Sequence, residues 1–472
     1  MAEKWIVLKF GGTSVAGREQ WETIASLAQT RRSEGFRVLL VCSAVAGVTN
    51  QLNALAYKPG SVDLLEELLE THRRLGRDLG VSEEAWLPEA VSLLQRCLGD
   101  LNHEPGPQYR AALLATGEWL STRIGRSFLS QQFEVDWVDA REALEVAEEP
   151  DVSPARKWLS AACKASESPD LSVRWAGLSP VLLTQGFVAR TKEGDTALLG
   201  RGGSDTSAAL LAGRLSAERL EIWTDVPGLF STDPRLVEEA RLLIEVDYAE
   251  ALEMAASGAK VVHPRCIRAA AAMKTPVVIR DLNRRSVAGT RIGSRIPEEA
   301  GVKTVTCQQR MAVLLLQNLD ARFQVGFLAE VFDIFRRRGI SVDLVATSET
   351  TTTVALNCET NHLGDDELKD LVENLGSHCK TTLFPDCVCV NLVGRGARTA
   401  LVHMQDVMRY FNTRPLLMAS QSANDLCLSL LVNAGDHELL IRAAHLALIP
   451  PADGTPHPVF GDSWRQIQQI AG

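Results

Sequence analysis

The run WIVLKFGGTS at residues 5–14 decides the fold, because two glycines and two hydroxyl side chains follow directly on an apolar strand pattern. A helical pattern begins soon afterwards, at Arg18. Glycines between a strand and a helix let backbone N–H groups approach phosphate oxygens closely, and the helix N-terminus adds a favourable dipole. Lys9 would bring a mobile positive charge to a transferring phosphoryl group. A tight strand-to-helix turn with a lysine at its edge is the structural alternative, and these residues alone favour neither.

Apolar runs alternate with helical patterns from this stretch up to residue 294. The alternation predicts an α/β domain with a mainly parallel sheet. Residues 63–101 are typical of two amphipathic helices that cover the sheet. We expect strands at residues 5–10, 38–42, 135–139, 181–185, 220–224 and 276–280.

The pattern changes after residue 294. Residues 305–386 read as strand, helix, two strands, helix and strand, and the same order starts again at Cys387. Ala346 aligns with Ala419 at an offset of 73 residues, the difference between the two positions. We therefore expect two ferredoxin-like βαββαβ modules, at 305–386 and 387–449, followed by a Pro-rich linker or tail at 450–472. Within this tail, residues 459–472 are either a final strand and helix or the beginning of a further part.

The composition is that of an ordinary globular protein. It has 49 basic and 59 acidic residues, a net charge of −10 and an apolar fraction of 46%, which argues against nucleic acid or a membrane as a partner. Neither a membrane span nor a leader is recognisable, so a cytoplasmic location is expected. The 10 cysteines are scattered, and the pair Cys387 and Cys389 has no histidine nearby, so a metal site is not expected there.

Two more loops follow predicted strands, where ligands settle in open α/β sheets. Residues 43–50 follow the second strand, and residues 194–205 lead into an Ala/Leu-rich helix. Arg201 can bind a carboxylate through two hydrogen bonds. Asp205 is either a helix N-cap or a functional carboxylate, and the two roles are compatible.

Other charged residues stand out along the same domain. Glu118 is a lone carboxylate in a helix of small residues; it is either exposed or, if buried, needs a cation such as a substrate ammonium. The run WTDVPGLFSTDPR at 223–235 is another loop after a strand. Lys260 adds a cation near a helix start, and His263 is more typical of packing or capping than of a base.

The Walker pattern and the H-R-D and D-F-G signatures are absent, so a phosphotransferase would belong to another lineage. Together the motifs resemble the amino-acid kinase family, and within it the aspartate kinases, whose order they follow. The resemblance implies a three-layer amino-acid kinase domain at 1–294, and the two modules resemble ACT domains. A strand contributed to the first module by the C-terminal segment is an open alternative. The matching runs are 9–14, 43–44, 117–118, 200–205, 224–235 and 258–265.

The resemblance implies ATP-dependent phosphorylation of the β-carboxylate of L-aspartate to 4-phospho-L-aspartate, the first step of lysine, threonine and methionine biosynthesis. An aspartate carboxylate is already ionised at neutral pH, so positioning and charge neutralisation suffice without a general base. Mg²⁺ would be carried by the ATP, and no tightly bound metal is expected.

The family also implies roles for individual residues. Lys9 and Asp205 would be catalytic, with Asp205 orienting Lys9. Phe230 stands where the family often has tyrosine, so one hydroxyl contact would be absent. The aspartate-binding residues would be Ser43, Ala44, Thr49, Glu118, Arg201 and Ser204. The nucleotide-binding residues would be Lys9, Gly11, Gly12, Thr224, Asp225, Phe230, Arg235, Lys260 and Val261.

Residues 326–349 are similar to the first module of the lysine-sensitive class, which binds lysine between ACT modules of two subunits. A homodimer or larger homo-oligomer is therefore expected, with Asp343 and Glu349 as partners for a cationic side chain. Threonine and methionine remain open as effectors. The implied effector residues are Phe327, Leu328, Ser341, Val342, Asp343, Ser348 and Glu349.

Three alternatives to an aspartate kinase stay open from the sequence. The first is another kinase of the same superfamily, acting on glutamate, acetylglutamate or a nucleotide. The second is an amino-acid sensor that keeps the fold without turnover. The third is the kinase part of a bifunctional fusion enzyme.

Overall fold

The computed structural model describes residues 4–99, 106–150, 152–259, 261–294, 300–317 and 325–470. The chain divides into two compact units. The expectation of one catalytic domain over 1–294 is too simple, because two stretches inside that range are built into the second unit. The first unit comprises Met1–Gly228, Glu245–Tyr248 and Val261–Ile296, and the second comprises Leu229–Ile244, Ala249–Lys260 and Pro297–Gly472.

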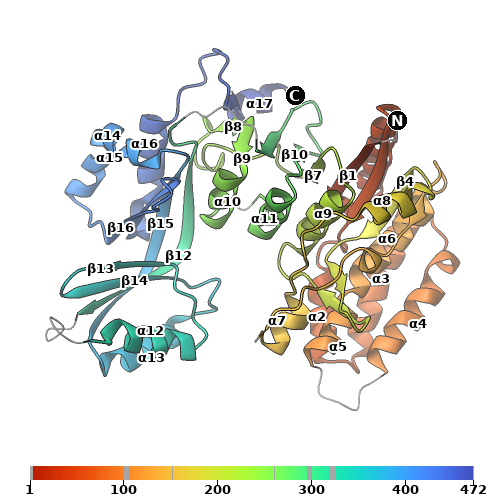
Figure 1. The fold of residues 1–472 in the computed structure, drawn as a ribbon, viewed down its shortest axis with the longest axis horizontal. Helices are drawn as coiled ribbons and strands as arrows, with labels where there is room; N and C mark the ends of the chain where they lie inside the picture. The colour runs from red at the N-terminus through yellow and green to blue at the C-terminus, as the bar shows by residue number, and fades with distance from the viewer. Residues whose placement is uncertain are drawn as a thin grey trace. The chain divides into compact units, whose positions relative to one another are not determined.

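The first unit is built on an eight-stranded sheet in the order β3-β4-β2-β1-β7-β10-β11-β9 (Figure 1). Neighbouring strands from β3 to β10 are parallel, and β11 runs antiparallel to β10. The central strands β1 and β2 are almost continuously apolar and buried, as expected where a parallel sheet is covered on both faces. The strands are β1 (Lys4–Phe10), β2 (Phe36–Cys42), β3 (Asp136–Trp137), β4 (Val181–Gln185), β7 (Leu220–Thr224), β9 (Glu245–Asp247), β10 (Val277–Asp281) and β11 (Thr290–Gly293).

Helices and a small hairpin complete the first unit. The two amphipathic helices expected at 63–101 are α3 and α4, and α3 is capped at its start by Ser61 and ended by Gly80 in the left-handed conformation. The hairpin joins β5 (Val188–Arg190) and β6 (Thr196–Leu198). The helices are α1 (Arg18–Ser33), α2 (Val48–Tyr57), α3 (Val62–Leu79), α4 (Leu87–Leu98), α5 (Pro107–Leu114), α6 (Thr116–Leu129), α7 (Pro154–Leu159), α8 (Pro169–Ala176), α9 (Gly203–Arg214) and α11 (Pro264–Ala272).

The second unit is built on a six-stranded antiparallel sheet in the order β13-β14-β12-β15-β17-β16. Two of its strands, β12 and β15, are 14 residues long, and they pair with each other along both modules with register shifts between Gln308 and Val313. The strands are β12 (Thr304–Gln317), β13 (Leu344–Thr347), β14 (Thr351–Asn357), β15 (Lys380–Val393), β16 (Met418–Gln421) and β17 (Cys427–Asn433).

The predicted mainly parallel α/β sheet followed by two βαββαβ modules is confirmed, but the modules share strands. The expected boundary at 386/387 falls inside β15, whose second half pairs with β17 while its first half belongs to the first module. The second module takes its last strand from residues 304–308 of β12. Among the residues that the structure describes, no strand of the C-terminal segment joins this sheet, and β18 (Phe460–Ser463) pairs with β8 (Arg241–Leu243) instead.

Helices of both modules pack on this sheet, among them α12, α13 and α16. In the first module, Val331, Phe335, Leu368, Leu371 and Leu375 of α12 and α13 form one core with the apolar side chains of β12 and β14. The helix expected at 399–411 in the second module is instead broken at Met404 into two short helices flanked by 3₁₀ turns. The helices are α10 (Tyr248–Ala256), α12 (Phe327–Arg337), α13 (Asp365–Gly376), α14 (Ala400–His403), α15 (Gln405–Met408), α16 (His437–Leu448) and α17 (Trp464–Ile470).

Within the ranges described, none of the helices combines the length and the hydrophobicity that crossing a bilayer requires.

Candidate active site

Lys9 and Asp205 form an ion pair at the centre of the predicted site. Lys9 is near the end of β1, Asp205 lies in the first turn of α9, and their Nζ and Oδ1 atoms are 2.5 Å apart. The side chains are only 11% and 15% exposed. The N-cap of α9 is Gly202, in the left-handed conformation at φ 65°. Asp205 is therefore not a plain helix cap, because its carboxylate is directed to the lysine.

The loops after β1 and β2 are joined by hydrogen bonds. Ser43 N donates to Phe10 O and Ala46 N donates to Gly12 O, each at 3.1 Å. A side chain at Gly12 would place its Cβ 2.8 Å from the carbonyl oxygen of Ala44, so the close approach of the two loops requires glycine there. Thr49 follows in the first turn of α2. Lys9, Gly11, Gly12, Ser43, Ala44 and Thr49 thus lie at the carboxyl edge of the parallel strands.

Glu118 is buried in α6 with one carboxylate oxygen unsatisfied. The residue is 3% exposed, and its carboxylate accepts the backbone N–H of Ala44. Its Oε2 atom has no hydrogen-bond partner among the described residues. Burial raises the pKa of Glu118 to about 8. Of the two possibilities left by the sequence, an exposed or a buried carboxylate, the structure has the buried one, next to the loop after β2.

Arg201 and Ser204 flank the start of α9. Arg201 is exposed in the turn before the helix, and Ser204 is one of its first residues. In the same helix Ser207 Oγ accepts the N–H of Phe187, which follows β4, at 3.1 Å. The loops after β1, β2 and β4 therefore converge with the N-terminal turn of α9.

His263 and Arg265 support the loop that carries Arg201. His263 caps α11 by accepting the Arg265 N–H at 3.2 Å. It also lies close to Gly202: a Cβ atom added at Gly202 would be 2.3 Å from the Cβ of His263. Burial, then the cation of Arg265, keep the pKa of His263 below its ordinary value. Arg265 donates to Leu199 O at 2.6 Å. His263 thus has the capping role favoured from the sequence. Val261 lies two residues before it, and Lys260 lies outside the described residues.

Thr224 is the last residue of β7 and Asp225 follows it, with Thr224 Oγ1 donating to Asp225 Oδ1 at 3.0 Å.

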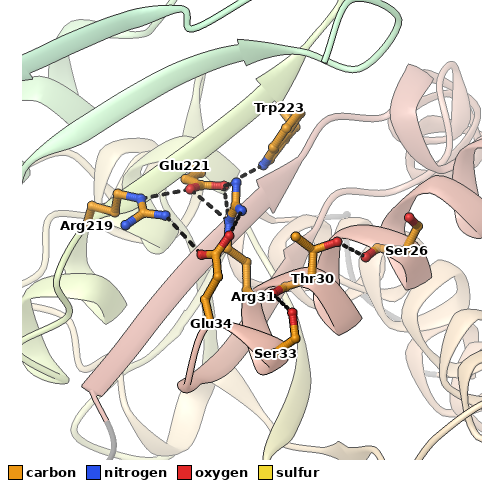
Figure 2. Close-up of polar contacts among 8 residues, drawn as sticks. All are labelled: Ser26, Thr30, Arg31, Ser33, Glu34, Arg219, Glu221 and Trp223. Carbon is orange, nitrogen blue, oxygen red and sulfur yellow. Dashed lines mark hydrogen bonds and ion pairs between the residues drawn. The ribbon is translucent and has the colours of Figure 1, made fainter. Parts of the chain in front are cut away.

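A charged cluster that sequence reasoning missed surrounds Glu221 in the same strand (Figure 2). Glu221, fully buried in β7, accepts from Arg31 Nε at 3.1 Å, Arg219 Nε at 2.8 Å and Trp223 Nε1 at 3.1 Å. The sequence does carry one sign of this cluster, a glutamate inside an otherwise apolar strand.

Two predicted nucleotide residues belong to the second unit. Arg235 is 89% exposed and forms a two-bond ion pair with Asp233, at 3.0 and 2.7 Å. The ring of Phe230 meets that of Trp464 edge-on, with centroids 5.7 Å apart. The predicted nucleotide set is thus divided, with Thr224, Asp225 and Val261 in the first unit.

The predicted effector residues occupy three loops of the first module. Phe327 and Leu328 begin α12, residues 341–343 lead into β13, and Ser348 and Glu349 lie between β13 and β14. The Asp343 carboxylate accepts the Asn357 N–H at 2.7 Å, and burial raises the pKa of Asp343. Hydrogen bonds such as this one hold the loops in place without using the Glu349 side chain.

A cavity of about 850 Å³ opens in the first unit, and none of the predicted site residues is part of its lining. Its lining includes Trp119, Arg123, Trp137, Asp139 and Arg141. The guanidinium of Arg123 pairs with Glu89, and that of Arg141 pairs with Asp139. Two of the cations that line this cavity, Arg123 and Arg141, are therefore already matched by carboxylates, and the third, Arg96, donates to Ser92 Oγ at 2.9 Å.

Cys387 and Cys389 are buried in one apolar core with Met311, Val313 and Leu431. In the part of the chain that the structure describes, no group of three or more His, Cys, Asp or Glu side chains is placed to hold a metal ion.

The chain is similar over most of its length to known kinases. The model of the amino acid kinase family matches residues 4–281. The lysine-sensitive aspartokinase 3 of Escherichia coli (strain K12) is 31% identical over 461 residues, covering 93% of this chain and 98% of that protein. The crystal structure of E. coli aspartokinase III with aspartate and ADP has a TM-score of 0.77 and 29% identity, covering 95% of this chain and 100% of that one. The same enzyme with lysine and aspartate has a TM-score of 0.75 and 29% identity, covering 94% and 100%. This chain therefore belongs to the amino acid kinase family.

Proposed function

We propose that this chain is an aspartate kinase, which transfers the γ-phosphoryl group of ATP to the β-carboxylate of L-aspartate. The observation that carries the proposal is the unsatisfied oxygen of Glu118, buried beside the loop of Ser43 and Ala44. A buried carboxylate in this state needs a cationic donor, and the α-ammonium of an amino acid supplies one. The E. coli relative crystallised with aspartate and ADP supports the same substrates.

The remaining charges of the site suit an anionic amino acid. Arg201 is exposed at the turn before α9, where it can form two hydrogen bonds with the α-carboxylate of aspartate. Ser43, Ala44, Thr49 and Ser204 line the same edge of the sheet. With both α-groups bound, the β-carboxylate is the end of the substrate that stays free to react.

The reaction forms a bond between a β-carboxylate oxygen and the γ-phosphorus of ATP and breaks the bond between that phosphorus and the β,γ-bridging oxygen, so that ADP leaves with the electron pair. Lys9 neutralises negative charge on the transferring group. Asp205, 2.5 Å from the Lys9 ammonium, orients it. No proton has to be removed from the nucleophile, because the carboxylate is ionised at neutral pH.

In the first unit, the backbone N–H groups of Gly11 and Gly12 hold the nucleotide together with Thr224, Asp225 and Val261. Phe230 and Arg235 belong to the nucleotide-binding set by family resemblance. Lys260 joins this set by family resemblance. Magnesium carried by the ATP phosphates supplies charge neutralisation when bound.

Regulation by an amino acid is the second part of the proposal. The first ACT-type module binds lysine through the loops that carry Phe327, Leu328, Ser341, Val342, Asp343, Ser348 and Glu349, in a homodimer or larger assembly. The E. coli relative is lysine-sensitive by name and was crystallised with lysine, which supports this effector. Inhibition through this site is a coupling between separate sites.

An assay for ADP release, combined with trapping of the acyl phosphate, tests the activity. We expect turnover that depends on L-aspartate and is at least tenfold weaker with L-glutamate. A preference for glutamate, or ADP release that is independent of any amino acid, would contradict the proposal. Titration with lysine, threonine and methionine tests the regulation, with Glu349→Gln expected to weaken inhibition by lysine and to leave uninhibited turnover unchanged.

A further inference from the structure

Residues 450–470 follow the second module and are built against the stretch Leu229–Ile244, which carries Phe230 and Arg235. Strand β18 pairs antiparallel with β8, with Phe460 opposite Leu243 and Ser463 opposite Arg241. The backbone bonds continue at both ends of this ladder: Ile244 N donates to Val459 O and Trp464 N donates to Ala240 O, each at 2.8 Å. The 450–470 segment is thus an integral part of this region and not a free linker.

Arg241 joins the two pieces through its side chain. The residue is 5% exposed, and burial keeps the pKa of its guanidinium below the ordinary value. Its Nε donates to Gly461 O at 2.9 Å and its Nη2 to Phe460 O at 2.7 Å, while Nη1 donates to the carbonyl oxygens of Pro450 and Pro451 at 3.2 and 3.1 Å. All of these acceptors belong to the 450–470 segment. Without the segment, this buried cation would lose the groups that compensate its desolvation.

Phe230 is held from two sides in the same region. Its ring contacts the Trp464 ring in an edge-to-face arrangement, with an interplanar angle of 86°. Its carbonyl oxygen accepts from Thr304 Oγ1 at 2.8 Å. The next residue, Ser231, is fully buried and hydrogen-bonded to His445 Nε2 at 2.8 Å. The conformation around Phe230 therefore depends on Trp464 as well as on the sheet of the second unit.

We propose that the 450–470 segment is a positioning element for the nucleotide, with Trp464 and Arg241 as its positioning residues. The segment holds Leu229–Ile244 in the conformation that presents Phe230 and Arg235 to ATP. The Arg235 guanidinium is oriented by its two-bond ion pair with Asp233. The inference rests on the proposed nucleotide role of this stretch, and it adds a part of the chain that no motif includes.

Trp464→Ala tests the proposal, with two matched controls. Trp464→Phe keeps an aromatic ring against Phe230, and Arg465→Ala removes a neighbouring exposed side chain that pairs with Glu238 and Glu239. The ADP dissociation constant is measured by calorimetry on the full chain, and KM is measured separately for ATP and aspartate. We expect Trp464→Ala to weaken ADP binding and raise KM for ATP about three- to tenfold, with KM for aspartate unchanged. Both controls should stay close to the wild type.

The outcomes separate this inference from the proposed activity. Wild-type chain that binds ADP but does not phosphorylate aspartate would contradict the activity, whereas the comparison of ADP affinities would still decide the role of Trp464. Unchanged ADP affinity in a folded Trp464→Ala variant, or KM values for ATP and aspartate that rise together, would overturn the inference. Failure of the wild type to bind ADP would overturn it as well. If Trp464→Ala does not fold, Trp464→Leu keeps most of the apolar volume and removes the ring, with the same expectations.

Discussion

Two buried groups of charges in the first unit are built in opposite ways. In the cluster around Glu221, both carboxylate oxygens accept from Arg31, Arg219 or Trp223, and no acceptor of this glutamate is left over. In the predicted active site, Glu118 has an unsatisfied oxygen, and the Lys9 and Asp205 pair keeps some exposure. The difference teaches that removing one member of a saturated buried cluster destabilises the fold, whereas an unsaturated buried carboxyl group is available for a ligand. The four predictions that follow test this contrast.

The largest effect is expected for Glu221→Gln. The substitution removes the negative charge that compensates two buried or half-buried guanidinium groups, so the free energy of unfolding should fall by about 3–5 kcal/mol. Unfolding in urea measures it. Glu34→Gln is the matched control, because Glu34 also pairs with Arg31 but is 41% exposed, and it should cost about 0–1 kcal/mol. Equal losses in the two variants would show that the cluster is not a structural unit.

Lys9→Ala should act on turnover instead of stability. Loss of the cation at the transferring phosphoryl group should lower kcat by about 10² to 10³-fold. The loss in unfolding free energy should stay below that of Glu221→Gln, because the pair is partly exposed. Lys4→Ala is the control on the same strand; its exposed ion pair with Glu218 should make it nearly silent in both measurements. Normal kcat in Lys9→Ala would remove Lys9 from the reaction.

Glu118→Gln sharpens the contrast between the two glutamates. We expect KM for aspartate to rise about 10- to 100-fold, because a charged hydrogen bond to the ammonium becomes a neutral one. Unlike Glu221→Gln, the substitution should not lower the free energy of unfolding at pH 8. Steady-state kinetics and urea unfolding of the same preparation measure both quantities. An unchanged KM would mean that Glu118 does not meet the substrate.

The smallest effect is the pH dependence that Glu118 contributes. Its pKa is raised from 4.5 to about 8 by burial, so between these values the folded chain holds a proton that the unfolded chain has released. Stability from this group therefore falls as pH rises from 4.5 to 8. KM for aspartate should fall over the upper part of the same range, because the ammonium binds the ionised form. In Glu118→Gln both trends should flatten, and their persistence would assign them to another group.

The loops of the site could be predicted because each follows its strand directly in the chain. The glycines at 11 and 12 and the charged residues at 201 and 205 can be recognised from the sequence around them. The parallel sheet then brings the carboxyl ends of the strands together. For Asp205, however, the local sequence could not distinguish a helix cap from an ion pair. That choice depends on Lys9, almost 200 residues away along the chain.

Contacts between distant segments were not predictable for the same reason. A glutamate in an apolar strand has no evident role in the sequence, and its role becomes clear only when the structure places Arg31 beside Glu221. The Pro-rich pattern at 450–458 suggested a linker, but the pairing of β18 with β8 depends on residues more than 200 positions earlier. The predicted module boundary failed because β15 continues through Pro385 and Asp386, with β12 paired to it on both sides of these residues.

The shared strands β12 and β15 also bear on protein engineering. A graft meant to change effector specificity by exchanging the first module would have to cut both 14-residue strands near their midpoints. The two halves of each strand would then come from different proteins, and the ladder between β12 and β15 would have to form across both junctions. The practical unit of exchange is the tandem pair, and recombination of regulatory parts between relatives is best made outside residues 304–433.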